Sequence, residues 1–266
     1  MQHPNNGKGI DLARDFDLAG RVAIVTGGSR GIGRATALRL GELGATVIIN
    51  YHRDRTAAEA VVSELRQMGA RAEALQADVA NLAAAEALIK GTLEFFRTID
   101  ILVCNAGIWQ GAPVEEISEE LWDRTMAINL KGTWSVCRAA VPIMKRNRSG
   151  RIVIVSSTAG QRGEAGVSNY AASKGGQISF TKSLSTELAE FDITVNCVAP
   201  GWVDTDMNDD VFADGERRQS IIRTIPLKRV ATADDIAAPI AFLCTDWARH
   251  ITGEVLNVNG GSVLCG

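Results

Sequence analysis

Short apolar runs alternate along the chain with longer stretches in which apolar residues recur at helical spacing. Runs that are apolar throughout, rather than at every second position, are typical of strands buried on both faces of a parallel sheet. They predict seven strands, at residues 21–26, 46–50, 72–77, 100–104, 151–156, 193–198 and 254–258. The helical spacing predicts helices at residues 34–43, 56–68, 81–96, 118–129, 133–146, 168–190 and 232–244.

Capping and turn residues stand at several of these predicted boundaries. Gly44 and Gly69 follow the first two helices, and Asn81, Ser118 and Thr232 occupy the N-cap positions of three others. By contrast, residues 202–223 are polar, acidic and irregular in pattern. We expect this stretch to form a mobile substrate lid, because lids that close over a substrate are often irregular and polar.

The alternation of strands and helices continues without an internal linker or repeat. It predicts an α/β fold: a single doubly wound Rossmann-type domain with a seven-stranded, mostly parallel sheet and helices on both faces. We place this domain at residues 19–266, after a polar N-terminal leader at residues 1–18.

Composition narrows the classes of function. The 266 residues are 46% hydrophobic but only 5% aromatic, so the core is built from Ala, Val, Ile and Leu. A net charge of −3 without a basic face argues against nucleic-acid binding. Apolar runs stay well short of the ~20 residues that a membrane helix needs, so no membrane partner is expected. A soluble, cytoplasmic protein is the prediction.

Cysteine and histidine give no sign of a metal or disulfide framework. The cysteines are odd in number, widely spaced and without a Cys-x-x-Cys pair, which favours small buried thiols in a reducing compartment. They are Cys104, Cys137, Cys197, Cys244 and Cys265. The three histidines, His3, His52 and His250, lack metal-ligand spacing, so no metal is predicted.

A glycine-rich turn lies between the first predicted strand and the first predicted helix. Its sequence is Gly-Gly-Ser-Arg-Gly-Ile-Gly over residues 27–33, with the spacing Gly-x-x-x-Gly-x-Gly. Glycines let the backbone approach a phosphate closely, and the helix beyond offers unpaired N–H groups and the positive end of its dipole. Strand, turn, helix and strand in this order predict a dinucleotide-binding unit.

A second candidate site is the pair Tyr170 and Lys174, four residues apart and therefore on one helix face. A phenol titrates near pH 10, so it is a poor acid–base catalyst at neutral pH. A neighbouring ammonium favours the phenolate, and we therefore expect Lys174 to lower the pKa of Tyr170. The pair also arises by chance on exposed helices, so its meaning depends on its surroundings.

Those surroundings are informative, because polar and turn residues follow several predicted strands. They are Asp78, residues 105–107, Ser156 with Ser157, and residues 200–201. In a doubly wound sheet, ligands bind beyond the carboxyl ends of the strands. We therefore expect these residues, the glycine-rich turn and the Tyr–Lys pair at one edge of the sheet.

Together these motifs resemble the short-chain dehydrogenase/reductase family across nearly the whole chain, and most of all its 3-oxoacyl-(acyl carrier protein) reductase-like members. The motifs are residues 26–33, Asp78-Val79, Asn105-Ala-Gly107, Asn129, Ser157, Tyr170-Ala-Ala-Ser-Lys174 and Pro200-Gly201. The resemblance implies an oxidoreductase that interconverts a carbonyl and a secondary alcohol, and most often a homotetramer.

The resemblance also implies catalytic roles. Tyr170 would be the general acid in reduction and the base in oxidation. Lys174 would assist it and hold the nicotinamide ribose, Ser157 would hydrogen-bond the substrate oxygen, and Asn129 would hold a proton-relaying water. The implied cofactor-binding residues are Gly27, Ser29, Gly31, Ile32, Gly33, Asp78, Val79, Asn105, Ala106, Gly107, Tyr170, Lys174, Pro200, Gly201 and Val203.

The end of the second strand favours NADP(H) over NAD(H). Members of the family that use NAD usually end it with an acid for the ribose 2′-hydroxyl, whereas here it continues Asn-Tyr-His-Arg to Arg53. Arg53 and Arg30 can both bind a 2′-phosphate, since guanidinium groups suit that dianion. Asp54, one residue later, would weaken this positive field.

The substrate remains open at this stage. Trp109, Trp202, Val203, Met207, Val211 and Phe212 are candidate pocket walls. The basic run at residues 145–148 suits an acidic acyl carrier protein, but Phe191-Asp192 stands where such reductases commonly have an Arg. A carrier-bound acyl group, a free ketone, a sugar, a polyol or a steroid-like alcohol all fit. A sensor that binds the nucleotide without turnover is the alternative from another class.

Overall fold

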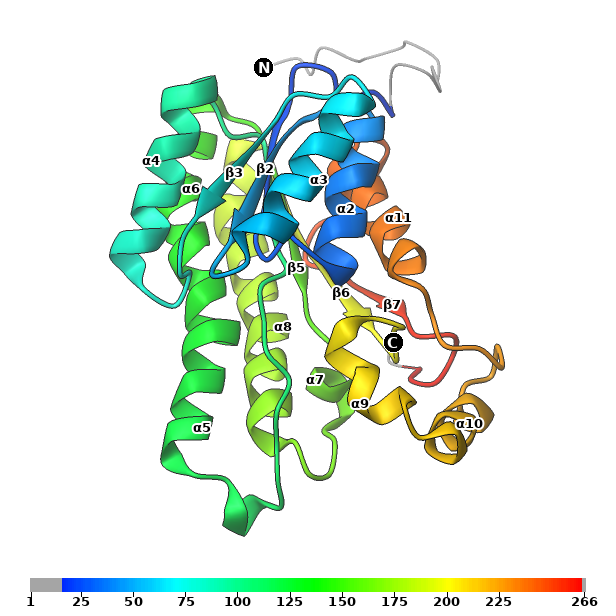
Figure 1. The fold of residues 1–266 in the computed structure, drawn as a ribbon. Coiled ribbons are helices and arrows are strands. Elements are labelled where there is room, and N and C mark those ends of the chain that lie inside the picture. Colours follow the sequence, from blue (N-terminus) through cyan, green and yellow to red (C-terminus); the bar gives the residue numbers. More distant parts are fainter. Residues whose placement is uncertain (1–15, 265–266) are drawn as a thin grey trace.

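Parallel strands form the centre of the protein, seen here in a computed structural model that describes residues 16–264 (Figure 1). Within that range the seven strands are β1 (Val22–Val25), β2 (Thr46–Tyr51), β3 (Ala72–Gln76), β4 (Ile101–Cys104), β5 (Gly150–Val155), β6 (Ile193–Pro200) and β7 (Val255–Val258). Their order is β3-β2-β1-β4-β5-β6-β7, and every neighbouring pair is parallel. The predicted α/β fold is confirmed, and the sheet is entirely parallel where a mostly parallel one was expected.

Helices cover both faces of the sheet. One face carries α2 (Gly31–Glu42), α3 (Arg55–Gln67) and α11 (Ala233–Cys244), whereas the other carries α4 (Leu82–Phe96), α6 (Gly132–Asn147) and α8 (Ser168–Leu188). Each face buries a core of Ala, Val, Ile and Leu side chains, as the composition predicts. The remaining elements are η1 (Val114–Glu116), α5 (Glu119–Thr125), η2 (Met126–Lys131), α7 (Thr158–Arg162), η3 (Ala189–Phe191), η4 (Asp206–Asn208), α9 (Asp209–Phe212), α10 (Gly215–Thr224) and η5 (Asp246–Ala248).

The predicted caps are confirmed. Asn81 accepts a hydrogen bond from Ala84 N at 3.0 Å, and Ser118 accepts one from Leu121 N at 3.1 Å. Thr232 forms a complete capping box with Asp235. These side chains satisfy N–H groups that a helix start otherwise leaves unpaired.

Two regions differ from the sequence prediction. The helices expected at residues 118–129 and 133–146 are one continuous rod, in which α5 and α6 are joined by the π-helical turn η2. The stretch at residues 202–223 is partly helical rather than irregular, because Asp214 accepts hydrogen bonds from Glu216 N and Arg217 N and so begins α10. In addition, β6 continues through Pro200, two residues beyond the predicted strand.

The end of the predicted polar leader belongs to the fold. Leu18 is buried in the core, and its N–H donates to the Leu43 carbonyl at 2.7 Å. Phe16 packs against Trp247 with ring centroids 4.9 Å apart. The rest of the leader, residues 1–15, and the predicted free thiol Cys265 lie outside the described residues.

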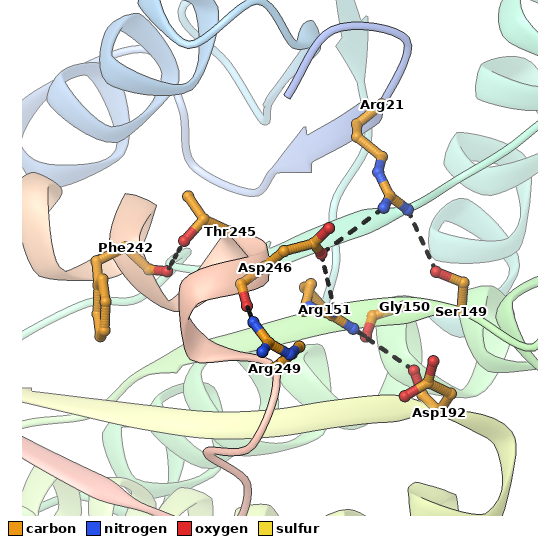
Figure 2. A network of polar contacts seen from close by, with 9 residues as sticks. All are labelled: Arg21, Ser149, Gly150, Arg151, Asp192, Phe242, Thr245, Asp246 and Arg249. Carbon is orange, nitrogen blue, oxygen red and sulfur yellow. Dashed lines mark hydrogen bonds and ion pairs between the residues drawn. The ribbon is translucent and has the colours of Figure 1, made fainter. Parts of the chain in front are cut away.

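A polar network ties the amino ends of the strands together (Figure 2). The Arg151 guanidinium, at the start of β5, donates to Asp246 Oδ1 at 3.2 Å, and Arg21 lies 3.9 Å from the same oxygen. Arg21 also donates to Ser149 Oγ at 3.2 Å. The network lies at the amino edge of the sheet, opposite the carboxyl edge where the glycine-rich turn follows β1.

The described part of the chain contains no helix that is long and apolar enough to cross a membrane. Across residues 16–264, His, Cys, Asp and Glu side chains also form no group of three or more that is placed to hold a metal ion. Cys104, Cys137, Cys197 and Cys244 are buried free thiols, as the sequence predicts.

Candidate active site

The glycine-rich turn follows β1 and leads directly into α2, which begins at Gly31, three residues before the predicted start. Gly27 and Gly31 have φ angles of +61° and +53°, a left-handed conformation that favours glycine. A Cβ on Gly33 would lie 2.2 Å from the Gly27 carbonyl oxygen, so the turn closes only without a side chain there. The turn therefore presents the amino end of α2, with its unpaired N–H groups, to the sheet edge.

Asn105 and Thr26 hold this turn in place. The Asn105 side-chain amide donates to Thr26 O at 3.0 Å and to Gly27 O at 3.1 Å. Thr26 Oγ1 in turn accepts from Asn105 N and Ala106 N at 2.9 and 3.1 Å. The loop after β4 is thus bonded to the loop after β1 across the point where the strand order reverses.

Two exposed cations follow neighbouring strands: Arg30 lies in the glycine-rich turn after β1, and Arg53 lies after β2. Within residues 16–264, the side chains of Arg30 and Arg53 have no hydrogen-bond or ion-pair partner. Asp54 forms no ion pair with either arginine in the described chain; its carboxylate caps α3 by accepting from Ala57 N at 2.9 Å. That its charge weakens the positive field stays a prediction. Asp78 accepts from Ala80 N at 3.0 Å and lies 3.9 Å from His52.

Tyr170 and Lys174 lie in the first two turns of α8, as their spacing predicts. Lys174 is buried; its ammonium donates to Val155 O at 2.8 Å and lies over the Tyr170 ring, 5.6 Å from the centroid. Burial disfavours the charged form and lowers the pKa of Lys174 to about 8.

The expected lowering of the tyrosine pKa does not occur. Burial raises the pKa of Tyr170 to about 12; a hydrogen bond with Ser157 opposes this rise, and the charge of Glu164 adds to it. Spacing alone identifies the neighbouring ammonium but not the burial of the phenol, which dominates. Tyr170 is consequently a neutral proton donor at physiological pH.

Ser156 and Ser157 have separate tasks. Ser156 Oγ is buried and donates to Lys174 O at 2.8 Å, which fixes α8 against the end of β5. Ser157 caps α7, accepts from Ala159 N at 3.1 Å and reaches Tyr170. Both serines line the cleft, and the role of Ser157 toward a substrate stays a prediction.

Asn129 sits within η2 and is fully buried. Its side chain accepts from Ile108 N at 2.8 Å and donates to Ile108 O and Ser173 Oγ, both at 3.0 Å. A Cβ on Gly107 would lie 3.3 Å from Asn129 Oδ1 and 3.5 Å from Lys174 Nζ, so both atoms border one small space. Asn129 thereby joins the loop after β4 to α8; its predicted role as holder of a relay water stays a prediction.

One cleft connects these groups. It is lined on the cofactor side by Ile32, Asn105, Gly107, Pro200, Gly201 and Val203, and on the catalytic side by Ser157, Tyr170 and Lys174. Trp109, Trp202 and Met207 form apolar walls, as predicted. Arg30 in the glycine-rich turn and Arg53 after β2 are not among the residues that line it.

Some predicted residues do not border the cleft. Val211 and Phe212 are buried within the lid segment itself, where Phe212 packs on Trp202 with ring centroids 6.0 Å apart. Val79 is buried against Gly132. The basic run ends at Arg148, which precedes β5 at the amino edge of the sheet and donates to Glu190 O at 2.6 Å. It does not border the cleft of its own chain.

Sequence reasoning missed several residues of the site, among them Thr26 and Glu164. Thr26 lies within the quoted glycine-rich motif, and a hydroxyl directly after a buried strand was the available signal. Glu164 lies within the stretch between Ser157 and Tyr170, and it lines the cleft. The sequence offers no signal for Glu164, because a loop has no periodicity from which to infer which way a side chain points.

Comparison with known proteins agrees with this geometry. A family model described as enoyl-(acyl carrier protein) reductase matches residues 27–262. A 3-oxoacyl-[acyl-carrier-protein] reductase from Synechocystis is 44% identical over 93% of this chain and 98% of the relative. The chain belongs to the short-chain dehydrogenase/reductase family of oxidoreductases.

Solved structures place the fold in the same family. A putative short-chain alcohol dehydrogenase from Sinorhizobium meliloti matches with a TM-score of 0.90 at 36% identity, covering 93% of this chain and 98% of that one. A putative NAD(P)-dependent gluconate 5-dehydrogenase from Beutenbergia cavernae, with bound NADP, matches with a TM-score of 0.89 at 39% identity and the same coverage.

Proposed function

We propose that the protein interconverts a carbonyl and a secondary alcohol with NADP(H). The observation that carries this proposal is one cleft that joins the glycine-rich turn to Ser157, Tyr170 and the buried Lys174. The turn at Gly27 and the amino end of α2 fit a pyrophosphate, since a side chain on Gly33 would fill the space that the backbone needs. NADPH, when bound, supplies the hydride.

The chain itself supplies position and a proton. Ser157 is placed to donate a hydrogen bond to the substrate oxygen, where negative charge develops during reduction. Tyr170 donates its hydroxyl proton to that oxygen, because its raised pKa keeps the proton on the phenol until then. Lys174 and Asn129 border one space beside Gly107. We infer that the proton lost by Tyr170 is replaced through this space.

The preference for NADP(H) rests on Arg30 and Arg53. Both guanidinium groups are exposed and without partners in the described chain, and Asp54 is engaged as the cap of α3. Two guanidiniums suit a 2′-phosphate. The putative gluconate dehydrogenase structure with bound NADP supports the same assignment.

Two substrate classes remain candidates. The 3-oxoacyl thioesters follow from the names of the similar reductases. A free carbonyl compound is favoured by a different observation, which concerns the basic residues suited to a carrier protein. At the far edge of the sheet, Lys145 pairs with Glu187 and Arg148 donates to the backbone carbonyl of Glu190.

Three further assignments belong to the proposal. We infer a single domain that includes Phe16 and Leu18 and whose segment 202–223 acts as a lid, because Trp202 and Met207 line the cleft. A homotetramer is supported by Trp122 and Trp134, each 39% exposed along the α5–α6 rod. A cytoplasmic location is supported by the buried free thiols.

The experiment is a rate comparison with NADPH and NADH against a 3-oxoacyl thioester of coenzyme A and a panel of free ketones. We expect turnover with at least one carbonyl compound and a lower KM for NADPH. Cofactor binding without oxidation by any substrate would instead indicate a nucleotide sensor. Turnover with a clear preference for NADH would contradict only the role of Arg30 and Arg53.

A further inference from the structure

Glu164 is the acidic side chain of the catalytic cleft. It lies between α7 and α8, in a turn bounded by Gly163 and Gly166 with φ angles of +74° and +79°. It lines the same cleft as Tyr170, whose phenol its charge influences. Within residues 16–264, the Glu164 carboxylate has no hydrogen-bond or ion-pair partner.

The turn that carries Glu164 is held in a fixed place. Val167 N donates to Glu164 O at 3.4 Å, and Asn169, at the start of α8, donates to Gln110 O at 3.1 Å. That second bond ties the turn to the loop of Trp109, the wall on the other side of the cleft. Glu164 is therefore part of the built wall of the cleft and not a side chain on a free loop.

The cleft that Glu164 lines has an aromatic wall. Trp109 and Trp202 meet edge to face, with ring centroids 6.1 Å apart, and Met207 lines the same cleft. The charged group that acts on the carboxylate is Arg162, which is exposed to solvent; Lys174 lines the same cleft, where Val155 O holds its ammonium. Desolvation raises the pKa of Glu164, whereas Arg162 opposes the rise.

A partly buried carboxylate without a partner is costly unless a ligand supplies a donor. We propose that Glu164 determines substrate specificity by accepting a hydrogen bond from a hydroxyl or ammonium group on a carbonyl substrate with an apolar body, and by rejecting substrates that end in an anion. The proposal rests on the proposed reductase function and names its substrate class. Aromatic walls suit such an apolar body and also attract an ammonium group.

The test uses benzylacetone and its para-hydroxy, para-aminomethyl and para-carboxy derivatives, which share one apolar body and one ketone. Initial rates with NADPH are measured for the wild type, Glu164→Gln and the control Glu216→Gln. The control removes one negative charge from α10 without touching the cleft. A 3-oxoacyl thioester of coenzyme A is included as an independent substrate.

We expect the wild type to favour the hydroxy or aminomethyl ketone over the carboxy ketone in kcat/KM by about tenfold or more, the size of a hydrogen bond to a charged group. In Glu164→Gln, the ratio of kcat/KM between the donor-bearing and the carboxy ketones should fall by about tenfold, while kcat/KM for benzylacetone itself changes little. Glu216→Gln should leave that ratio unchanged. Comparing kcat/KM for the hydroxy and the aminomethyl ketone shows whether Glu164 prefers a neutral hydrogen-bond donor or a cation.

Several results would overturn the inference. One is equal kcat/KM across the series; another is a uniform change with Glu164→Gln. Reduction of the thioester but of none of the benzylacetones would overturn the substrate class while leaving the reductase function intact. If neither thioester nor ketones are reduced although NADPH binds, the proposed function itself fails.

Discussion

Replacing Gly33 by Ala tests whether the glycine-rich turn binds the cofactor. A Cβ at this position would lie 2.2 Å from Gly27 O and 2.5 Å from Asn105 Nδ2. Favourable non-bonded contacts need more than about 3.5 Å, so the turn and the start of α2 must separate by about 1 Å. That movement breaks the hydrogen bonds from Asn105 to Thr26 O and Gly27 O.

The expected magnitude follows from these contacts. Overpacking costs roughly 1–3 kcal/mol and each lost hydrogen bond about 1 kcal/mol, against roughly 1 kcal/mol gained from the helix propensity of Ala. With two hydrogen bonds lost, we expect the free energy of unfolding to fall by about 2–4 kcal/mol. The Kd for NADPH should rise by about tenfold or more, because the N–H groups of α2 move away from the phosphates.

The assay combines urea unfolding with NADPH titration, and Gly91→Ala is the matched control. Gly91 is also inside a helix, but a Cβ there would meet only an ordinary contact, Leu75 Cδ1 at 3.5 Å. The control should gain roughly 0.5–1 kcal/mol of stability and bind NADPH normally. If Gly33→Ala binds NADPH as tightly as the wild type, the reasoning about the turn is refuted.

Three further predictions concern charge. Lys174 has a folded pKa of about 8 against an ordinary 10.5. Because the unfolded chain binds this proton more tightly, the buried lysine destabilises the fold increasingly as the pH falls from about 10.5 to about 8, and by a constant amount below that. Lys174→Met should therefore raise the unfolding free energy at neutral pH by roughly 1–3 kcal/mol, with a gain that shrinks at higher pH in urea titrations; equal gains at all pH values would contradict this. Arg53→Asp should raise the KM for NADPH by about tenfold or more and that for NADH far less, whereas a parallel rise would argue against a 2′-phosphate contact. Asp246→Ala should lower the unfolding free energy by about 1 kcal/mol, because Arg151 loses its partner while Asp246 itself is 45% exposed, and an unchanged urea midpoint would show that the network contributes nothing.

The fold and the position of the site were predictable because both follow from local patterns. Apolar runs identify buried strands, and parallel strands bring their carboxyl ends to one edge. For that reason Ser157, Asn105 and Gly107 were expected together, and the structure places all three along one cleft. N-cap residues such as Asn81 were also predictable, because a cap depends only on its neighbours in the sequence.

Features that depend on tertiary contacts were not predictable. The π-helical turn around Asn129 is held by bonds to Ile108 and Ser173, which are distant in sequence. Helix α10 was not predicted, because the acidic residues of segment 202–223 suggested irregular structure. One of those acids, Asp214, is in fact the N-cap of the helix. The pKa of Tyr170 took the opposite direction from the expected one because spacing does not reveal burial.

The central claim is that Tyr170 supplies the proton for carbonyl reduction. The most direct measurement is kcat of Tyr170→Phe with NADPH and a carbonyl substrate, alongside NADPH affinity as a control for folding. We expect kcat to fall by about 100-fold or more with a similar Kd for NADPH, because general acid catalysis contributes at least that much. A kcat close to that of the wild type would contradict the account.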